Sequence, residues 1–199
     1  MQHFHPIATP TIGSGAFTPA GVRSRRLTAS DSAIFANHLR RLDGETRRLR
    51  FGAPVNDGFV ERYATTTLTG SAYVRGLFVD GVLRGAAELH VDAKSNNGEG
   101  AFSLEAPFQS RGFGTLLFQA VLDAARNRGV ETLTLNCLRE NVRMQRIARR
   151  QGAEIAFDRG DVVARIARPH PDAGTLAREW SEAIGAVVSA PAGPRTIAA

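Results

Sequence analysis

The chain has little of what would place it outside a reducing cytoplasm. Cys137 is its only cysteine, so an intrachain disulfide is excluded and nothing favours an oxidising compartment. Residues 1–20 lack the basic and apolar regions of a secretory signal, and no stretch approaches the roughly 18 apolar residues of a membrane span. We therefore expect a soluble, cytoplasmic protein with no membrane partner.

Lysine is almost absent as well, since Lys94 is the only one in a chain of 199 residues with a formal net charge of +6. The positive charge is therefore nearly all arginine, gathered at 23–26, 40–50 and 139–150. Such runs are usually solvated surface, and we favour that interpretation over a basic patch for phosphates or an acidic partner. Aromatic residues are sparse in 139–150, which disfavours nucleic-acid binding.

The length and a hydrophobic content of 43% predict one globular domain, which we place at residues 21–168. A flexible segment is expected at 1–20, a C-terminal helix at 169–188 and a flexible tail at 189–199. The apolar face of that helix suits either a homodimer contact or a cover for the sheet.

Within the domain the pattern predicts helices first, then a β-hairpin, then strands and helices in alternation. The expected elements are a strand at 21–28, a helix opened by Ser30 or Asp31, two short helices of which the second lies near 57–66, a hairpin turning at Asp80-Gly81, a strand at 99–105 ended by Pro107, a helix from Phe113 that ends before Gly129, a strand at 132–137, a helix at 141–152 and a hairpin at 153–168. This order predicts an α/β fold with a mixed sheet covered by helices.

A glycine-rich turn, "QSRGFG" at residues 109–114, stands between a strand and the longest helix. A helix N-terminus offers unpaired N–H groups, and Gly112 and Gly114 would let a phosphate approach the backbone. A Walker loop needs a Gly-Lys-Ser/Thr that the chain lacks, and a dinucleotide fingerprint needs a third glycine where Leu117 stands. The pattern Gln/Arg-x-x-Gly-x-Gly/Ala is met in full, beginning at Gln109.

Here the sequence resembles the GNAT superfamily of N-acetyltransferases, whose central motif grips the pyrophosphate of acetyl-CoA with this loop. The strand "TLTLNC" and the helix "N-x-x-M-x-x-I-A-x-x-x-G" resemble the second conserved segment, and the pattern is most similar to the bacterial Pat-type protein-lysine acetyltransferases. The resemblance covers about 21–168 and is specific from 99 to 153. It implies the GNAT fold and an acetyl-CoA-dependent N-acetyltransferase that acts on a primary amine, of a protein lysine or a small molecule, without a metal.

The resemblance also assigns roles to single residues. Backbone N–H groups of the loop would hold the pyrophosphate, and the preceding strand would run beside the pantetheine arm. For Asn141 a simple helix N-cap is an equally good explanation. The residues expected to bind acetyl-CoA are Phe102, Ser103, Leu104, Gln109, Ser110, Arg111, Gly112, Phe113, Gly114, Thr115 and Asn141.

Acetyl transfer to an amine needs a proton acceptor, because an alkylamine holds its proton at pH 7. The best candidate is Glu99, ten residues before Gln109, at the offset of the Pat-type catalytic Glu; an exposed strand-end carboxylate is the alternative. By the two-residue period of a strand, Glu105 is a second carboxylate on the same face. Glu88 and His90 also share a face, and a structural role is favoured for that histidine.

One position departs from the family pattern. Many members carry a Tyr seven residues after the helix-start Asn as the acid for the departing thiolate, and here that position is Ala148. A low-pKa thiol leaves without such help, so activity is not excluded, and Pat-type segments also tend to have Ala there. Cys137 is interpreted as a buried small hydrophobe. The competing function is a non-catalytic acyl-CoA-binding regulatory domain, which a blocked acceptor cleft would favour, whereas an open cleft beside Glu99 would favour the enzyme.

Overall fold

The structure is a computed structural model, and it describes residues 21–158 and 161–167. The strands are β1 (Val22–Arg26), β2 (Tyr73–Val79), β3 (Val82–Val91), β4 (Asn97–Leu104), β5 (Thr132–Leu138), β6 (Glu154–Asp158) and β7 (Asp161–Ala167). The α-helices are α1 (Ser32–Arg41), α2 (Gly44–Phe51), α3 (Asp57–Thr69), α4 (Phe113–Asn127) and α5 (Val142–Arg150), with short 3-10 turns at Ala29–Asp31 and Ala106–Phe108. The predicted segments at 1–20, 169–188 and 189–199 lie outside the described residues.

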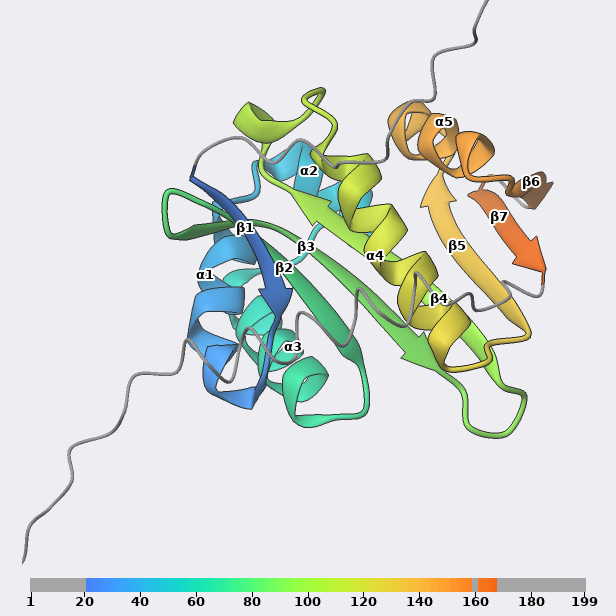
Figure 1. Ribbon diagram of the computed structural model, residues 1–199. Coiled ribbons are helices and arrows are strands. Elements are labelled where there is room, and N and C mark those ends of the chain that lie inside the picture. The colour runs from blue at the N-terminus through green and yellow to red at the C-terminus, as the bar shows by residue number, and fades with distance from the viewer. Residues whose placement is uncertain (1–20, 159–160, 168–199) are drawn as a thin grey trace, which may run out of the picture.

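The seven strands form one mixed sheet in the order β1-β2-β3-β4-β5-β7-β6. Helix α4 lies on one face of the sheet, and α1, α2 and α3 lie on the other (Figure 1). The predicted α/β fold, a mixed sheet flanked by helices, is confirmed. In the part of the chain that the structure describes, no helix is both long enough and apolar enough to cross a membrane.

Local sequence signals account for the clearest elements. Asp80 and Gly81 both have positive φ, at 50° and 77°, which is the geometry of a tight I′ hairpin turn between β2 and β3. Helix α4 buries the apolar side that its period predicts, except that Leu116 is exposed, and Gly129 follows it at a φ of 63°. The expected hairpin, helix and closing glycine are therefore confirmed.

Two hydrophobic clusters hold the layers together, one on each face of the sheet. The larger packs α4 and Ala148 of α5 on β3 and β5, with Phe118, Leu133 and Leu135 at its centre. The smaller packs α1 and α3 on β2 and β3 around Phe35. Because β2 and β3 both contribute to the two clusters, these are the strands against which both helical layers are positioned.

Strands β4 and β5 are the only parallel neighbours in the described sheet, and they pair over a short length. Their register joins Asn97–Glu99 to Thr132–Thr134 and then stops. Beyond it, β4 remains paired to β3 as far as Leu104, and β5 remains paired to β7 as far as Leu138. The two strands therefore start side by side and diverge toward the end at which α4 begins (Figure 1).

A buried carboxylate ties the end of β4 to α1. Glu105 accepts hydrogen bonds from His38 Nδ1 at 3.1 Å, Arg41 Nε at 2.9 Å and Arg84 Nη1 at 2.9 Å. Burial alone would raise the pKa of this carboxyl, but these three donors outweigh it and lower the pKa to about 2. His38 Nε2 is 2.9 Å from the Ser103 hydroxyl, so one hydrogen-bonded chain links the helix to β4 and to the residue that follows it.

Replacing Glu105 with Gln should weaken the fold, because a buried charged network loses its anion. We expect the free energy of unfolding at pH 7 to fall by about 3–5 kcal/mol in urea denaturation. The folded-state pKa lies below the unfolded value of about 4.3, so the carboxylate stabilises the fold above that value and its contribution is lost as the pH falls through about 2. The difference in the free energy of unfolding between wild type and Glu105→Gln should therefore be smaller at pH 3 than at pH 7, by roughly half.

The exposed carboxylate Glu154 provides the matched control, and Glu154→Gln should change the free energy of unfolding little at either pH. If the loss in the free energy of unfolding caused by Glu105→Gln is the same at pH 7 and pH 3, the assignment of an ionised, buried Glu105 is contradicted.

Candidate functional site

The divergence of β4 and β5 leaves one edge of β4 without a strand neighbour, from Gly100 to Leu104. The side chains of this segment are already committed to the two faces of the sheet. Phe102 stacks on Phe118 of α4 with ring centroids 5.3 Å apart, and Ser103 points to the other face, where it bonds His38. What this edge offers to a ligand is therefore its backbone, and the predicted role of Phe102 to Leu104 beside the pantetheine arm stays a prediction.

The predicted phosphate loop stands where that edge ends. Ser110 and Gly112 have φ of 60° and 86°, and Gly112 is the N-cap of α4. The first helical bonds run from the N–H groups of Thr115 and Leu116 to the Gly112 carbonyl. Among the described residues, the backbone N–H groups from Ser110 to Gly114 have no acceptor, so they form a row of free donors at a helix N-terminus.

The two loop glycines have different surroundings. A Cβ at Gly112 would meet nothing within 4 Å, so only its positive φ favours glycine there. A Cβ at Gly114 would lie 3.0 Å from Ile147 Cδ1 of α5, so the close packing of two helices favours a small residue at this position. Gly112 is thus the position where the absence of a side chain leaves room for a ligand.

Several predicted cofactor residues have structural partners of their own. Gln109 Nε2 donates to the Leu104 carbonyl at 2.9 Å and its Oε1 accepts from Arg143, so this side chain fixes the loop between β4 and α5. Phe113 is buried in the core, and Asn141 Oδ1 accepts from the Met144 N–H at 3.2 Å as the N-cap of α5. The N-cap alternative therefore accounts for the geometry of Asn141.

Arg111 and Thr115 remain exposed at the loop and the first turn of α4, and the Arg111 guanidinium lies 5.8 Å from the ring centroid of Phe108.

Two positions of the second conserved segment, Ala148 and Cys137, cannot act as an acid or a nucleophile at the surface. Ala148 is fully buried in the core, and Cys137 is buried, which raises the pKa of its thiol.

An open cleft of about 440 Å³ lies at the point where β4 and β5 begin to diverge. Its lining residues come from the end of β3, the β3–β4 turn, the start of β4 and the middle of β5. They are His90, Val91, Asp92, Ser95, Asn97, Gly98, Glu99, Thr134 and Asn136. Two of them are acidic residues, Asp92 and Glu99, and none is lysine or arginine, although the chain as a whole carries a net charge of +6.

Glu99 is exposed in this cleft and is held from the opposite strand. Asn136 Nδ2 of β5 donates to Glu99 Oε1 at 3.1 Å, across the point where the strands separate. Sequence reasoning did not find Asn136, although the alternation of "TLTLNC" contained a signal: Thr132, Thr134 and Asn136 are its polar positions and share one face. Glu105, by contrast, is buried among its three donors and is not available as a second base.

Glu88 and His90 share a face, as predicted, and meet at 3.1 Å between Glu88 Oε2 and His90 Nε2. Glu88 is fully buried, and it accepts from Arg50 Nη2 of α2 and the Tyr63 hydroxyl of α3, each at 2.6 Å. Burial opposes its ionisation, but the charge of Arg50 and the bonds from His90 and Tyr63 outweigh it and lower the pKa of Glu88 to about 2. Burial and the charge of Glu88 raise the pKa of Tyr63 to about 12, so the phenol stays protonated.

The predicted site residues therefore gather at two ends of one strand edge. Glu99 lies at the start of the free edge of β4, and the loop at 109–114 follows its end. At about 3.3 Å per residue, the five residues between Glu99 and Glu105 extend over roughly 17 Å. An elongated ligand with an anionic group would have free loop donors at one end of this edge and an acidic cleft at the other.

Residues 43–153 match the model of the Acetyltransferase (GNAT) family. This chain belongs to the GNAT acetyltransferase family. The protein is therefore an enzyme that transfers acetyl groups, and because GNAT acetyltransferases use acetyl-CoA, the predicted acetyl donor is confirmed.

Solved structures of other GNAT proteins share the fold. The GNAT domain of S. lividans PAT is 20% identical, with a TM-score of 0.64, over 73% of this chain and 90% of that one. The putative acetyltransferase yncA from Salmonella typhimurium, solved with acetyl-CoA, is 15% identical with a TM-score of 0.56, over 77% and 99% of the two chains. The paia N-acetyltransferase from Thermoplasma acidophilum, in complex with coenzyme A, is 16% identical with a TM-score of 0.56, over 73% and 98%.

Proposed function

We propose that this protein transfers an acetyl group from acetyl-CoA to the nitrogen of a primary amine, on a protein lysine or a small molecule, by direct attack of the amine on the thioester. The observation that carries the proposal is the free edge of β4, which runs from a row of unpaired loop N–H groups to Glu99 in an open cleft. The GNAT-family structures solved with acetyl-CoA or coenzyme A support the same use of the fold.

In this proposal the loop from Ser110 to Gly114 holds the pyrophosphate through its free N–H groups and the dipole of α4. The exposed hydroxyl of Thr115 adds a further donor. Backbone groups of Gly100 to Leu104 pair with the pantetheine arm, which takes the place of a neighbouring strand. Gln109 supports this site by fixing the loop to Leu104.

The acceptor side is suited to a cation. An alkylamine is an ammonium ion at pH 7, and the carboxylates of Asp92 and Glu99 would attract it into the cleft. Glu99 accepts a proton from the reacting nitrogen, directly or through water, in the course of acetyl transfer. Asn136 positions the Glu99 carboxylate by bonding one of its two oxygens.

The open cleft also favours an enzyme over the alternative function, a non-catalytic regulatory domain that binds acyl-CoA. A domain that only senses acyl-CoA would need no path for a second substrate, whereas the cleft beside Glu99 is open.

With Ala148 buried at the usual position of the acid, we propose that the thiol leaves as the thiolate. The single buried cysteine suits a reducing compartment, and we propose that the protein acts in the cytoplasm as one domain over 21–168. We also propose that the protein belongs with the Pat-type acetyltransferases, a proposal supported by the likeness to the S. lividans domain.

Two glycines at opposite ends of α4 give a matched test of the loop. Gly112 and Gly129 both have positive φ and no atom within 4 Å of a built Cβ, so Gly112→Ala and Gly129→Ala should each cost about 1 kcal/mol of stability. Gly112→Asp adds a negative charge beside the proposed pyrophosphate. In isothermal titration with acetyl-CoA we expect Gly129→Ala to bind like wild type, Gly112→Ala to bind more weakly and Gly112→Asp to bind at least 100-fold more weakly (~3 kcal/mol). Equal affinities for all four proteins would place the pyrophosphate elsewhere.

Glu99→Gln tests the base while keeping the size of the side chain and its bond from Asn136. Thiol release in the presence of a panel of primary amines should fall about 10²- to 10⁴-fold in kcat, the usual contribution of a general base. Acetyl-CoA binding should not change, because Glu99 lies at the far end of the β4 edge from the loop. Glu154→Gln, which removes an exposed carboxylate from β6, is the control. Full activity in Glu99→Gln would show that another group accepts the proton.

A further inference from the structure

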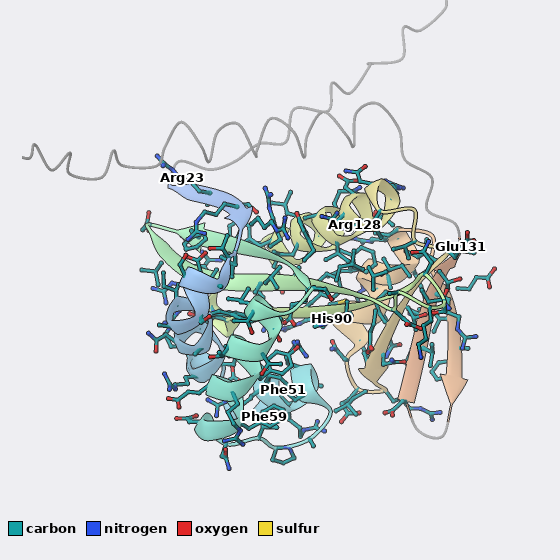
Figure 2. All side chains as sticks on the ribbon, turned by 90° about the horizontal axis from the view of Figure 1, so that it is seen from below. Arg23, Phe51, Phe59, His90, Arg128 and Glu131 are labelled. Carbon is teal, nitrogen blue, oxygen red and sulfur yellow. The ribbon has the colours of Figure 1, made fainter. Side chains whose placement is uncertain are left out.

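We propose that His90 is a second proton-accepting group of the acceptor cleft, oriented by the buried carboxylate of Glu88 and acting together with Glu99. This inference rests on the proposed amine acetyltransfer. The sequence favours a structural histidine at this position. The structure places the His90 side chain at 41% exposure in the lining of the cleft, on the same side of the sheet as Phe51 and Phe59 (Figure 2).

The partners of Glu88 determine which nitrogen of His90 carries the proton. Glu88 is ionised and accepts from Arg50 through Oε1 and from Tyr63 through Oε2, so it can only act as an acceptor toward His90 as well. Nε2 of the neutral ring must therefore be the protonated nitrogen, because it lies 3.1 Å from Glu88 Oε2. Nδ1 is left with its lone pair, which is the form of imidazole that accepts a proton.

This arrangement follows the logic of a carboxylate that orients a catalytic histidine. The carboxylate is buried and fixed by two further donors, which holds one tautomer of the ring and leaves Nδ1 to take a proton. Because the ring itself is partly exposed, its bond to Glu88 contributes little to the stability of the fold and mainly sets the direction of the ring.

His90 and Glu99 are direct neighbours across the β3–β4 pair. Their Cα atoms are register partners, and side chains of directly opposite residues stand on the same face with Cβ atoms about 4.5–5.5 Å apart. Both side chains line the same cleft. A nitrogen that enters the cleft next to Glu99 therefore lies next to His90 as well.

The chemistry has a use for two acceptors, because an ammonium nitrogen loses two protons when it becomes an amide. His90 Nδ1 takes the first proton, and the freed lone pair forms the C–N bond. Glu99 takes the second proton from the same nitrogen after that bond has formed. The C–S bond breaks and its electron pair leaves with the thiolate, and the two accepted protons pass to solvent or to that thiolate, which returns both side chains to their starting states.

Imidazole rescue of a histidine deletion tests this role. In His90→Ala we expect kcat/KM for an alkylamine to fall about 10²-fold or more and to recover on the order of 10-fold when imidazole is added. Pyrazole, which has the same shape but is a much weaker base, should not restore activity, and wild type should not respond to either compound. His90→Gln, whose amide can still donate to Glu88, should be as slow as His90→Ala if the lost function is proton transfer.

An aromatic amine acceptor, which is already neutral at pH 7, separates the two proton transfers. Its acetylation by His90→Ala should fall far less than that of an alkylamine, while Glu99→Gln should slow both acceptors. Thermal melting and titration with acetyl-CoA are measured on each variant, and both should match wild type, because His90 lies neither in the core nor at the loop.

The possible outcomes are distinct. Wild-type activity in both His90 variants would overturn the proposal, and so would a loss of activity that imidazole does not restore in a variant with a normal melting temperature and normal acetyl-CoA affinity. An unstable His90→Ala would leave His90→Gln and the two acceptors to decide. If wild type binds acetyl-CoA but acetylates no amine, or does not bind it, the proposed function itself has failed and this inference fails with it.

Discussion

The separation of β4 from β5 is the constraint on which the rest of the site depends. Two adjacent parallel strands would normally pair along their length, but here each is fully paired on its other edge to a different neighbour, β4 to β3 and β5 to β7. The strands share three register positions and then diverge. Unpaired backbone groups are costly when they are buried, so a fold that keeps them free at one edge needs water or a ligand to satisfy them. Gln109 satisfies the last of them, at Leu104, and the remainder face the gap.

Arginine side chains join the helices to one another and to the sheet. The composition left open whether the arginine runs are solvated surface or bind a partner. The run at 40–50 is interpreted from sequence as solvated surface, yet its arginines pair with acidic residues from across the fold. The pairs are Arg40–Glu61, Arg41–Glu105, Arg47–Asp57, Arg48–Glu140 and Arg50–Glu88. A guanidinium presents several donors in a fixed plane, so one arginine can bond a carboxylate and a carbonyl or phenol together, as Arg50 does with Glu88 and Tyr63.

Much of the fold could be predicted because its signals are local. The Asp80-Gly81 turn, the apolar period of α4 and the glycine-rich loop each depend on a few neighbouring residues, and the structure confirms them. The parts that sequence reasoning missed depend on burial and on distant partners. Glu105 looks like a usable carboxylate until His38 and Arg41, more than sixty residues earlier, are found to enclose it. The composition of β3 in the same way gives no sign that Glu88 is buried and ionised while His90, two residues later, reaches an open cleft.

Helix α2 is attached to the rest of the fold mainly through polar contacts. No residue of α2 is fully buried, and only its last residue, Phe51, packs against the smaller hydrophobic cluster, whereas α1, α3 and α4 supply buried residues to the clusters. Ion pairs hold it instead, from Arg50 to Glu88 of β3 and from Arg48 to Glu140 beyond the end of β5, together with the contacts of Phe51 with Phe59 and Tyr63. Helix α2 therefore bridges the two halves of the divided sheet with little apolar burial. Elements with few buried apolar contacts open at the lowest free-energy cost, so we expect α2 to open more readily than α1, α3 and α4. Because Arg50 also fixes Glu88, and Glu88 orients His90, movement of this helix and the alignment of the cleft are physically linked.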